Sequence, residues 1–301
     1  MTRLTSFTIF LFASVVLLII SPLTAHAQSG VPLADLLRST HIHGLAVDRP
    51  DSGRLLIATH HGLHALRLDT GMVDLVSERQ DDFMGFTPHP TDAPTLYASG
   101  HPARGGNLGF IISRDGGRSW SKLADGVDGP VDFHQMDVSK ADPSVIYGIF
   151  GNLQKSADGG RSWRRIGPAP EGIIALAASS KAPDRIYAAT QRGLVLSTDG
   201  GRRWQPAHEA RQAATMVHVT PDGTIYAFIA GTGLVRAEEP ELDWTTLGDG
   251  FDDEFVLHVA VGGGRERPTL YAVAVNPKTR IQSLHVSRDG GQSWAPLTKD
   301  K

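Results

Sequence analysis

The sequence has 301 residues, of which 20% are charged and 41% hydrophobic, a balance that is typical of a globular protein and too apolar for a disordered one. Its formal net charge is −3, with 29 Lys plus Arg against 32 Asp plus Glu, so it lacks the basic excess of a nucleic-acid-binding protein, and we expect no nucleic-acid partner. The absence of cysteine excludes disulfides, thiolate metal ligands and a cysteine nucleophile.

The first 27 residues have the pattern of a secretory signal peptide. Arg3 precedes an apolar stretch from Leu4 to Ile20, and Ala25-His26-Ala27 supplies a small-x-small cleavage site. We expect cleavage before Gln28, which leaves residues 28–301 as a single domain without a membrane span, located in the periplasm or secreted. An uncleaved anchor is the alternative, because the apolar stretch is nearly long enough to span a bilayer.

Four octapeptides of the form Ser-x-Asp-Gly-Gly-x-x-Trp recur along the rest of the chain. They begin at Ser113, Ser156, Ser197 and Ser287 and end at Trp120, Trp163, Trp204 and Trp294. A degenerate fifth copy without Asp-Gly-Gly runs from Ala237 to Trp244, so all five tryptophans occupy one repeat position. Successive tryptophans are 43, 41, 40 and 50 residues apart, which is the period of a propeller blade.

A second recurring motif is a short apolar triplet, usually with a central Tyr, which predicts one strand in each of six units. The triplets are Leu56–Ala58, Leu96–Ala98, Ile146–Gly148, Ile186–Ala188, Ile225–Ala227 and Leu270–Ala272. At about 46 residues per unit, the pattern predicts an all-β fold, a β-propeller of six four-stranded blades. The octapeptides would form turns between third and fourth strands, and residues 31–40 would contribute to closing the ring.

The octapeptide resembles the Asp box of BNR-repeat proteins, found in sialidases, sortilin-type receptors, photosystem II assembly factors and exported glycosyl-hydrolase-like propellers. The resemblance covers nearly all of the chain after residue 27 and implies a propeller. We interpret the boxes as structural turns, because Asp accepts backbone hydrogen bonds, Gly adopts positive φ and Trp packs between strands. Calcium binding or catalysis by the box aspartates is the less favoured alternative. The residues assigned this structural role are Ser113, Asp115, Gly116, Trp120, Ser156, Asp158, Gly159, Trp163, Ser197, Asp199, Gly200, Trp204, Ser287, Asp289, Gly290 and Trp294.

Strand direction places the boxes on one face of the ring, called the bottom here, and the starts of the first strands on the opposite face, the top. Aligning the first strands makes His43, Met84 and His134 equivalent, with Asp82 and Asp132 two residues before the latter two. Six of the 13 histidines fall on the top of the first three blades. The candidate metal ligands are His41, His43, His60, His61, Met84, His101 and His134, supported by Asp82 and Asp132.

Imidazole ligands suit several transition metals, and the thioether of Met84 favours copper, so we predict copper first and zinc second. Asp82 and Asp132 would either ligate the metal or orient a histidine through its second ring nitrogen. Two alternatives stay open: a pocket for a small molecule or glycan that uses the same groups, and histidines that serve only as ordinary polar residues at strand ends.

The predicted function is therefore that of an exported binding protein with a role in metal handling. A glycoside hydrolase is the alternative, in which Asp82 and Asp132 would be the two catalytic carboxylates. A sialidase is disfavoured, because no Arg lies at the start of any first strand and no Glu is adjacent to a Tyr in sequence. A second alternative is an assembly or scaffold protein with a protein partner, as the resemblance to photosystem II assembly factors implies.

Overall fold

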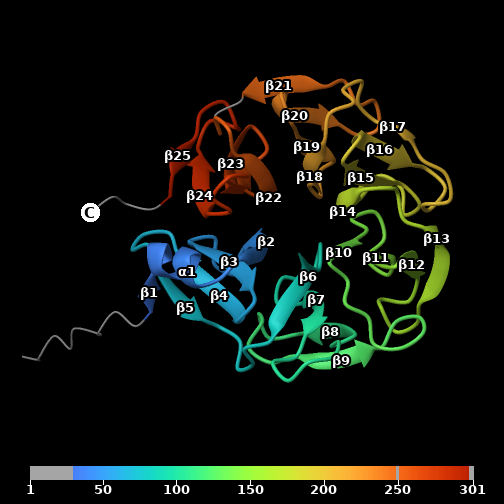
Figure 1. The fold of residues 1–301 in the computed structure, drawn as a ribbon, viewed down its shortest axis with the longest axis horizontal. Coiled ribbons are helices and arrows are strands. Elements are labelled where there is room, and N and C mark those ends of the chain that lie inside the picture. The colour runs from blue at the N-terminus through green and yellow to red at the C-terminus, as the bar shows by residue number, and fades with distance from the viewer. Residues whose placement is uncertain (1–29, 249–250, 298–301) are drawn as a thin grey trace, which may run out of the picture.

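The computed structural model describes residues 30–248 and 251–297, and these form six antiparallel β-sheets around a central axis (Figure 1). Apart from β1 in the first sheet, each sheet takes its strands in chain order from the axis outward, which confirms the predicted β-propeller of six blades. The predicted signal peptide, residues 1–27, lies outside the described residues. Within residues 30–248 and 251–297, no helix has the length and apolarity needed to cross a bilayer.

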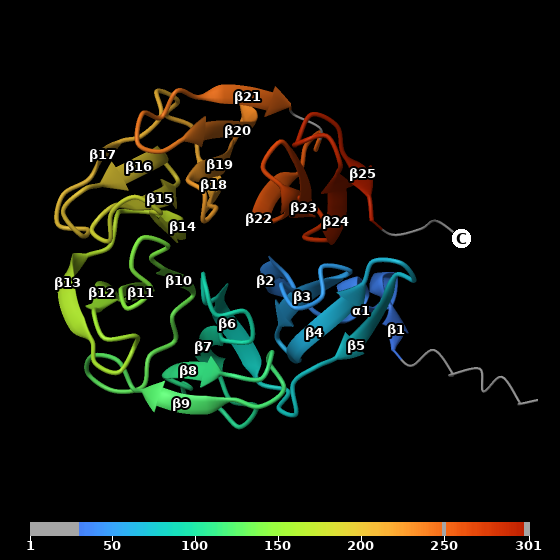
Figure 2. The ribbon, with the colours of Figure 1, turned by 180° about the vertical axis from the view of Figure 1, so that it is seen from behind.

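The strands are short and fall into four positions in every blade, seen from both faces of the ring (Figures 1 and 2). The first strands are β2 (Ile42–Val47), β6 (Asp82–Pro88), β10 (Gln135–Val138), β14 (Ile173–Ala178), β18 (Ala214–Val219) and β22 (Phe255–Gly264). The second strands are β3 (Arg54–Thr59), β7 (Leu96–His101), β11 (Ile146–Phe150), β15 (Ile186–Thr190), β19 (Thr224–Ile229) and β23 (Arg267–Val275). The third strands are β4 (Gly62–Arg67), β8 (Phe110–Ser113), β12 (Asn152–Ser156), β16 (Gly193–Ser197), β20 (Gly233–Glu238) and β24 (Gln282–Ser287). The fourth strands are β5 (Met72–Leu75), β9 (Ser121–Ala124), β13 (Arg164–Pro168), β17 (Gln205–Pro206), β21 (Thr245–Gly248) and β25 (Ala295–Pro296).

The hydrophobic core lies between blades rather than within them. Six clusters of buried apolar side chains are found among the described residues, and each joins one blade to the next around the ring. The tyrosines of the second-strand triplets lie in these layers, with Tyr147, Tyr187 and Tyr226 at most 2% exposed. A sheet buries both faces only by contacting two neighbours, so the blades stabilise one another as stacked repeats do.

Each Asp box forms the turn between the third and fourth strands of its blade. In the second box, Asp158 Oδ1 accepts hydrogen bonds from the Ser156 hydroxyl at 2.8 Å and the Ser162 amide at 2.9 Å. These bonds, with that of the Ser162 hydroxyl contributing most, lower the pKa of Asp158 to about 2. The Gly159 amide donates to the Ser144 carbonyl, in the loop that follows a first strand, so the boxes lie on the bottom face.

The second glycine of each box lies directly against the preceding blade. Gly160 has φ +87°, and a Cβ built on it would lie 2.1 Å from Phe110 Cε1 of the preceding blade. The corresponding Gly117 and Gly201 face the preceding blades' Leu63 and Leu153 at 2.2 and 2.1 Å. Glycine is therefore required at this position for two reasons: the backbone has positive φ, and there is no room for a Cβ.

The degenerate fifth copy forms its turn without an Asp-Gly-Gly sequence. It contacts the fourth blade through hydrogen bonds instead of through a glycine. The buried carboxylate of Glu239 accepts hydrogen bonds from the Ser180 amide at 2.9 Å and the Tyr187 hydroxyl at 2.9 Å, both in blade four. The Trp244 indole donates to the Ala207 carbonyl at 2.7 Å, whereas Trp163 donates to the second glycine of its own box.

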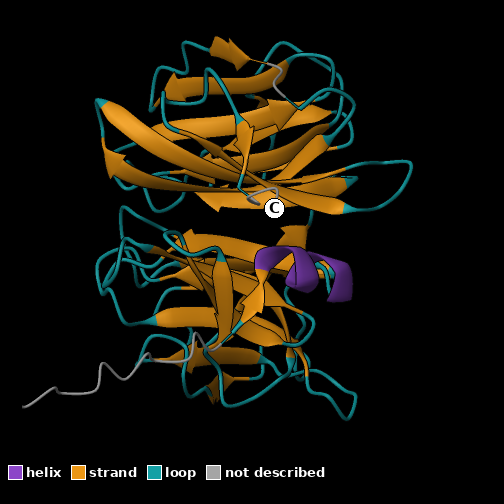
Figure 3. Ribbon diagram, turned by 90° about the vertical axis from the view of Figure 1, so that its left-hand side faces the viewer, coloured by secondary structure: helices purple, strands orange, loops and turns teal. Residues whose placement is uncertain are grey.

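The first blade differs from the prediction, because it has five strands instead of four. The additional strand β1 (Val31–Pro32) pairs with the outer strand β5, and helix α1 (Leu33–Ser39) follows it. Leu33 and Leu36 of α1 are buried in the cluster that joins the first and last blades, and Figure 3 shows α1 beside this junction. A two-residue strand has no sequence pattern of its own, which is why it was not predicted.

The ring closes between β2 and β24 through a side chain. The Ile42 amide donates to Gln282 Oε1 at 2.7 Å, and Gln282 Nε2 donates to the Ile42 carbonyl at 3.3 Å. In the part of the chain that the structure describes, no strand is exchanged between the first and last blades, whose sheets each consist of strands consecutive in sequence apart from β1. Gln282 and α1 together therefore secure the junction, as the expectation for residues 31–40 anticipated in part.

The two glycines of one box allow the packing constraint to be measured. Gly159→Ala and Gly160→Ala both place alanine at positive φ, at a cost of about 1–2 kcal/mol each. Only Gly160→Ala also drives a methyl group into Phe110, so we expect it to lower the free energy of unfolding by roughly 1–3 kcal/mol more than Gly159→Ala. Urea denaturation of the two variants measures the difference, and equal losses would contradict the inter-blade constraint.

Candidate functional site

The first cluster of the candidate site comprises His43, His60 and Asp82, contributed by the top of the first two blades. His43 lies in β2, His60 in the turn between β3 and β4, and Asp82 at the start of β6. His60 Nδ1 lies 2.8 Å from Asp82 Oδ2, and His43 Nε2 lies 3.2 Å from His60 and 3.8 Å from Asp82 Oδ1. Three potential metal ligands thus converge from three separate chain segments.

The second cluster comprises His101, Asp132 and His134, contributed by the second and third blades. Asp132 Oδ2 lies 2.8 Å from His101 Nε2 and 2.6 Å from His134 Nε2. His101 Nδ1 lies 2.9 Å from the Gly106 carbonyl, to which it donates. A backbone acceptor of this kind fixes the ring orientation of metal-binding histidines and leaves the other nitrogen free for its partner.

Each cluster contains one buried carboxylate oxygen that has no hydrogen-bond partner among the described residues. These atoms are Asp82 Oδ1 and Asp132 Oδ1. The Asp132 side chain is only 5% exposed. A buried acceptor without a partner is costly in a folded protein, so such an atom calls for a ligand or another role.

The two clusters adjoin each other through the β6–β7 strand pair. Asp82 of the first cluster is the direct cross-strand neighbour of His101 of the second. Directly opposed residues in an antiparallel pair have Cα atoms about 4.5–5.5 Å apart. The clusters therefore form one continuous group of imidazoles and carboxylates on the top face.

Burial and nearby charges shift the pKa values of His43 and His134 in opposite directions. Burial, with a further contribution from His60, lowers the pKa of His43 to about 4, although Asp82 opposes the shift. The hydrogen bond to Asp132 raises the pKa of His134, and the charge of Asp82 adds to the effect. At neutral pH His43 is an uncharged imidazole, while His134 holds its proton more tightly than an isolated histidine.

His41 and His61 lie at the rim of the first cluster. Their ring centroids are 5.6 and 6.4 Å from that of His60, and both residues are exposed. The structure thus brings His41, His43, His60 and His61 together, as the sequence predicted, but only His43 and His60 have nitrogens within ligand distance of Asp82.

The predicted equivalence of His43, Met84 and His134 is wrong. Leu45, Thr87 and Asp137 pair with the central residues of the second-strand triplets. Two residues further along each second strand, the partners are Ile42, Met84 and Gln135, so Met84 corresponds to Ile42, and the register skips His43 as a bulged residue. Gly44, which follows His43, makes room for Phe86, since its Cβ would lie 2.8 Å from Phe86 Cβ.

Met84 is buried in β6, where it pairs with Ser99. Its side chain is 8% exposed.

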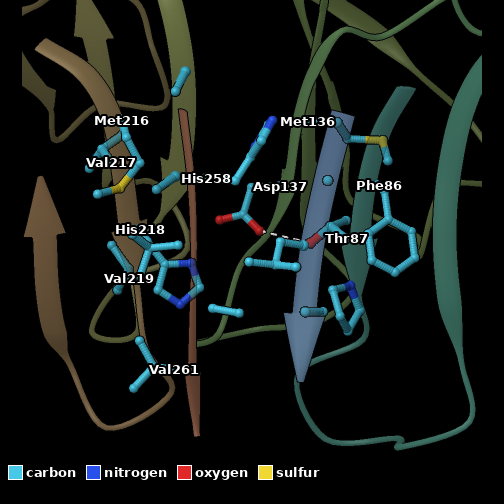
Figure 4. A pocket seen from close by; sticks show the side chains of 18 of the residues that line it. Phe86, Thr87, Met136, Asp137, Met216, Val217, His218, Val219, His258 and Val261 are labelled. Atoms are coloured by element: carbon cyan, nitrogen blue, oxygen red, sulfur yellow. Dashed lines mark hydrogen bonds between the residues drawn. The ribbon is translucent and has the colours of Figure 1, made fainter. Parts of the chain in front are cut away.

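A channel of about 460 Å³ runs between the first strands and is lined by both His43 and His134. His218 and His258, on strands of the fifth and sixth blades, also line it (Figure 4). Burial lowers the pKa of both histidines to about 4, so they are neutral at pH 7. Neither His218 nor His258 was predicted to belong to the site; the pattern that could have indicated them is a histidine inside an apolar first strand.

Comparison with known proteins supports the fold. The model of the BNR/Asp-box repeat matches residues 111–122, which contain the first octapeptide in full. The chain is a six-bladed β-propeller that carries an Asp-box repeat. The GH74 xyloglucanase from Xanthomonas campestris is similar in structure, with a TM-score of 0.57 and 20% identity over 87% of this chain and 46% of that chain.

Two further solved structures resemble this Asp-box propeller. YCF48 bound to D1 peptide has a TM-score of 0.52 and 16% identity, covering 86% of this chain and 84% of that chain. An auxiliary nutrient binding protein from Bacteroides thetaiotaomicron has a TM-score of 0.56 and 10% identity, covering 81% and 69%. At these identities the likeness concerns the fold alone, and the chain spans less than half the length of the GH74 enzymes. No curated protein sequence matches the chain.

The opposite pKa shifts of His43 and His134 give a direct test of the site. In a metal-free NMR titration, we expect the His43 ring signals to stay constant from pH 7 to 5 and to shift near pH 4, whereas His134 titrates above 6.5. Asp132→Asn removes the charged acceptor and should lower the His134 midpoint. Because the unfolded chain protonates His43 near 6.5, its contribution to stability is lost as the pH falls from 6.5 toward 4. Midpoints near 6.5 for both residues would contradict the described geometry.

Proposed function

We propose that this propeller is a metal-binding protein that holds divalent transition metals at the two His-Asp-His clusters, with copper(II) first and zinc(II) second. The observation that carries the proposal is the convergence, in each cluster, of two imidazoles and one carboxylate whose ligand atoms lie within 4.8 Å of one another. Imidazole and carboxylate are common ligands of both metals, and the affinity order of divalent ions places copper(II) above zinc(II).

The spacing within the clusters is close to what a metal requires. A tetrahedral site with metal–ligand distances of about 2.0–2.2 Å has ligand–ligand separations of about 3.3–3.6 Å. In the first cluster, Asp82 Oδ2 lies 2.8 Å from His60 Nδ1, and Asp82 Oδ1 lies 3.8 Å from His43 Nε2. In the second cluster, Asp132 Oδ2 lies 2.8 Å from His101 Nε2 and 2.6 Å from His134 Nε2. The hydrogen-bonded pairs would separate by about 0.5–1.0 Å to reach coordination geometry.

The unpartnered oxygens Asp82 Oδ1 and Asp132 Oδ1 favour a cation over a purely structural role. A bound metal would satisfy the charge of each carboxylate and, through bidentate or bridging coordination, the free oxygen itself. The ordinary interpretation of polar residues at strand ends leaves both oxygens unsatisfied, at a free-energy cost of about 1–3 kcal/mol for each.

The ligand set also bears on the oxidation state of copper. Copper(I) prefers sulfur ligands, and the two clusters consist of nitrogen and oxygen ligands. Met84 is buried in β6 and is not required by either cluster, so the proposal is for copper(II) rather than for the copper(I) that a thioether would favour.

The place of this activity follows from the N-terminal pattern, and we propose that metal binding occurs in the periplasm or outside the cell. Glycoside hydrolysis and protein scaffolding are not proposed, because fold similarity does not establish either function. If the wild-type protein hydrolysed a glycoside and both Asp82→Asn and Asp132→Asn abolished this activity, glycoside hydrolysis would be supported instead.

Metal stoichiometry tests the proposed function. Untagged protein titrated with Zn²⁺ or Cu²⁺ in a calorimeter should bind about two equivalents. His60→Ala should remove one equivalent and His101→Ala the other, each with an affinity loss above about 100-fold, because loss of a ligand exceeds the 10–100-fold cost of losing a second-shell partner. The matched control is His208→Ala, a histidine outside both clusters.

Retention of two equivalents by the control, with circular dichroism spectra unchanged in all variants, would assign the metals to the clusters. Absence of stoichiometric binding by the wild-type protein, or equal losses in His60→Ala and His208→Ala, would refute the proposal.

A further inference from the structure

The channel between the first strands adjoins both clusters. One residue of each cluster lines it, His43 of the first and His134 of the second. Its volume of about 460 Å³ is in the range of sites for small organic molecules, roughly 300–1,000 Å³. A metal held by His43 or His134 would therefore lie beside space that can hold a small molecule.

The first strands direct particular side chains to this channel through β-bulges. The register of β2, β14, β18 and β22 skips one residue near the start of each strand, and the skipped residues are His43, Ile174, Thr215 and Leu257. Bulges re-aim side chains and are frequent beside binding sites. His43, Ile174 and Leu257 line the channel, whereas the Thr215 hydroxyl donates to the Val256 carbonyl at 2.7 Å.

The mouth of the channel is divided into a polar and an apolar half. The clusters come from the first three blades, whereas Ile174 lies on the fourth blade and Leu257 on the sixth. Neither of these two side chains is fully buried, and neither belongs to a hydrophobic cluster between blades. Apolar side chains that line a cavity without packing into the core are available to contact a ligand.

The interior of the channel has little unpaired charge. Among its described lining residues, Asp137 forms an ion pair with Lys140 and accepts hydrogen bonds from Thr87 Oγ1 at 3.1 Å and the Ala178 amide at 2.7 Å (Figure 4). Arg49, which follows β2 toward the bottom face, donates to the Pro90 carbonyl. Apart from His134, the remaining lining is apolar or neutral, so an ionic group placed away from Arg49 and His134 would lose hydration there without gaining a partner.

We propose that the protein binds its metal together with a small organic chelator, whose uncharged, largely apolar body lies in the channel while its donor atoms complete the coordination of the metal. This inference rests on the metal-binding function proposed above. Three protein ligands leave at least one coordination position open, as in zinc sites that bind a water or substrate. The apolar half of the mouth, Ile174 and Leu257, would contact the body of the chelator.

The test uses hydroxyquinoline, a neutral, flat, bidentate chelator, and its sulfonate, which binds metal through the same atoms but is negatively charged. Protein loaded with Zn²⁺ and freed of excess metal is titrated with each compound in a calorimeter, and metal content is measured afterwards. We expect hydroxyquinoline to form a ternary complex, the zinc-free protein to bind it at least about tenfold more weakly, and the sulfonate to bind more weakly than the parent compound.

Two substitutions fill the apolar half of the mouth without touching a metal ligand. Ile174→Trp and Leu257→Trp should each weaken the ternary complex by about tenfold or more and leave zinc stoichiometry unchanged. Leu75→Trp, at an exposed position on an outer strand, is the matched control and should have no effect. Two channel variants are used so that a folding defect in one does not remove the test.

The outcomes separate this inference from the proposed function. Normal zinc binding with no ternary complex, or removal of zinc from the protein by hydroxyquinoline, would overturn the chelator proposal and leave the metal proposal standing. Equal chelator affinity with and without zinc, or no effect of both channel substitutions, would also overturn it. Failure of the wild-type protein to bind zinc would refute the metal proposal itself.

Discussion

Neighbouring blades meet at the second glycine of each Asp box, where a turn on the bottom face approaches the third strand of the preceding blade. At Gly160 and Gly201 the space for a Cβ is already occupied by Phe110 or Leu153. Because the core lies between blades, this approach sets how closely the sheets can stack and hence the width of the central channel. In the fifth blade, whose box is degenerate, the buried Glu239 accepts hydrogen bonds from the fourth blade and so links these two neighbouring blades.

The aspartates of the bottom face and of the top face differ in how fully their oxygens are hydrogen-bonded. Asp158 of a box is surrounded by hydroxyl and amide donors that hold it ionised and engage both of its oxygens. Asp132 on the top face shares one oxygen between two histidines and leaves the other buried without a partner among the described residues. A satisfied carboxylate stabilises a turn, whereas an unsatisfied one beside imidazoles retains capacity for a ligand. The bottom face therefore maintains the fold, and the top face is free to carry chemistry.

The repeats predicted the blades because their signals are local: each box encodes one turn, and each triplet such as Leu96–Ala98 encodes one strand. The convergence of histidines on the top of the first three blades was predicted from strand direction alone. The pairing within the clusters was not, because the bulge at His43 shifts the register by one residue and a strand alignment cannot detect it. The strand β1 and the contact of Gln282 with Ile42, 240 residues apart in sequence, lack any local pattern.

A ring of near-identical blades would produce a symmetric channel, yet this one has the two His-Asp clusters beside it on the first three blades and Ile174 and Leu257 on the fourth and sixth. Several blades have a β-bulge near the start of the first strand. The bulged residue is histidine in the first blade and isoleucine or leucine at positions 174 and 257. A change of one side chain there alters the channel without altering the packing between blades, since that packing depends on other residues of the strand. Binding specificity in this fold can thus change independently of its stability, which explains how a strongly constrained repeat accommodates an asymmetric site.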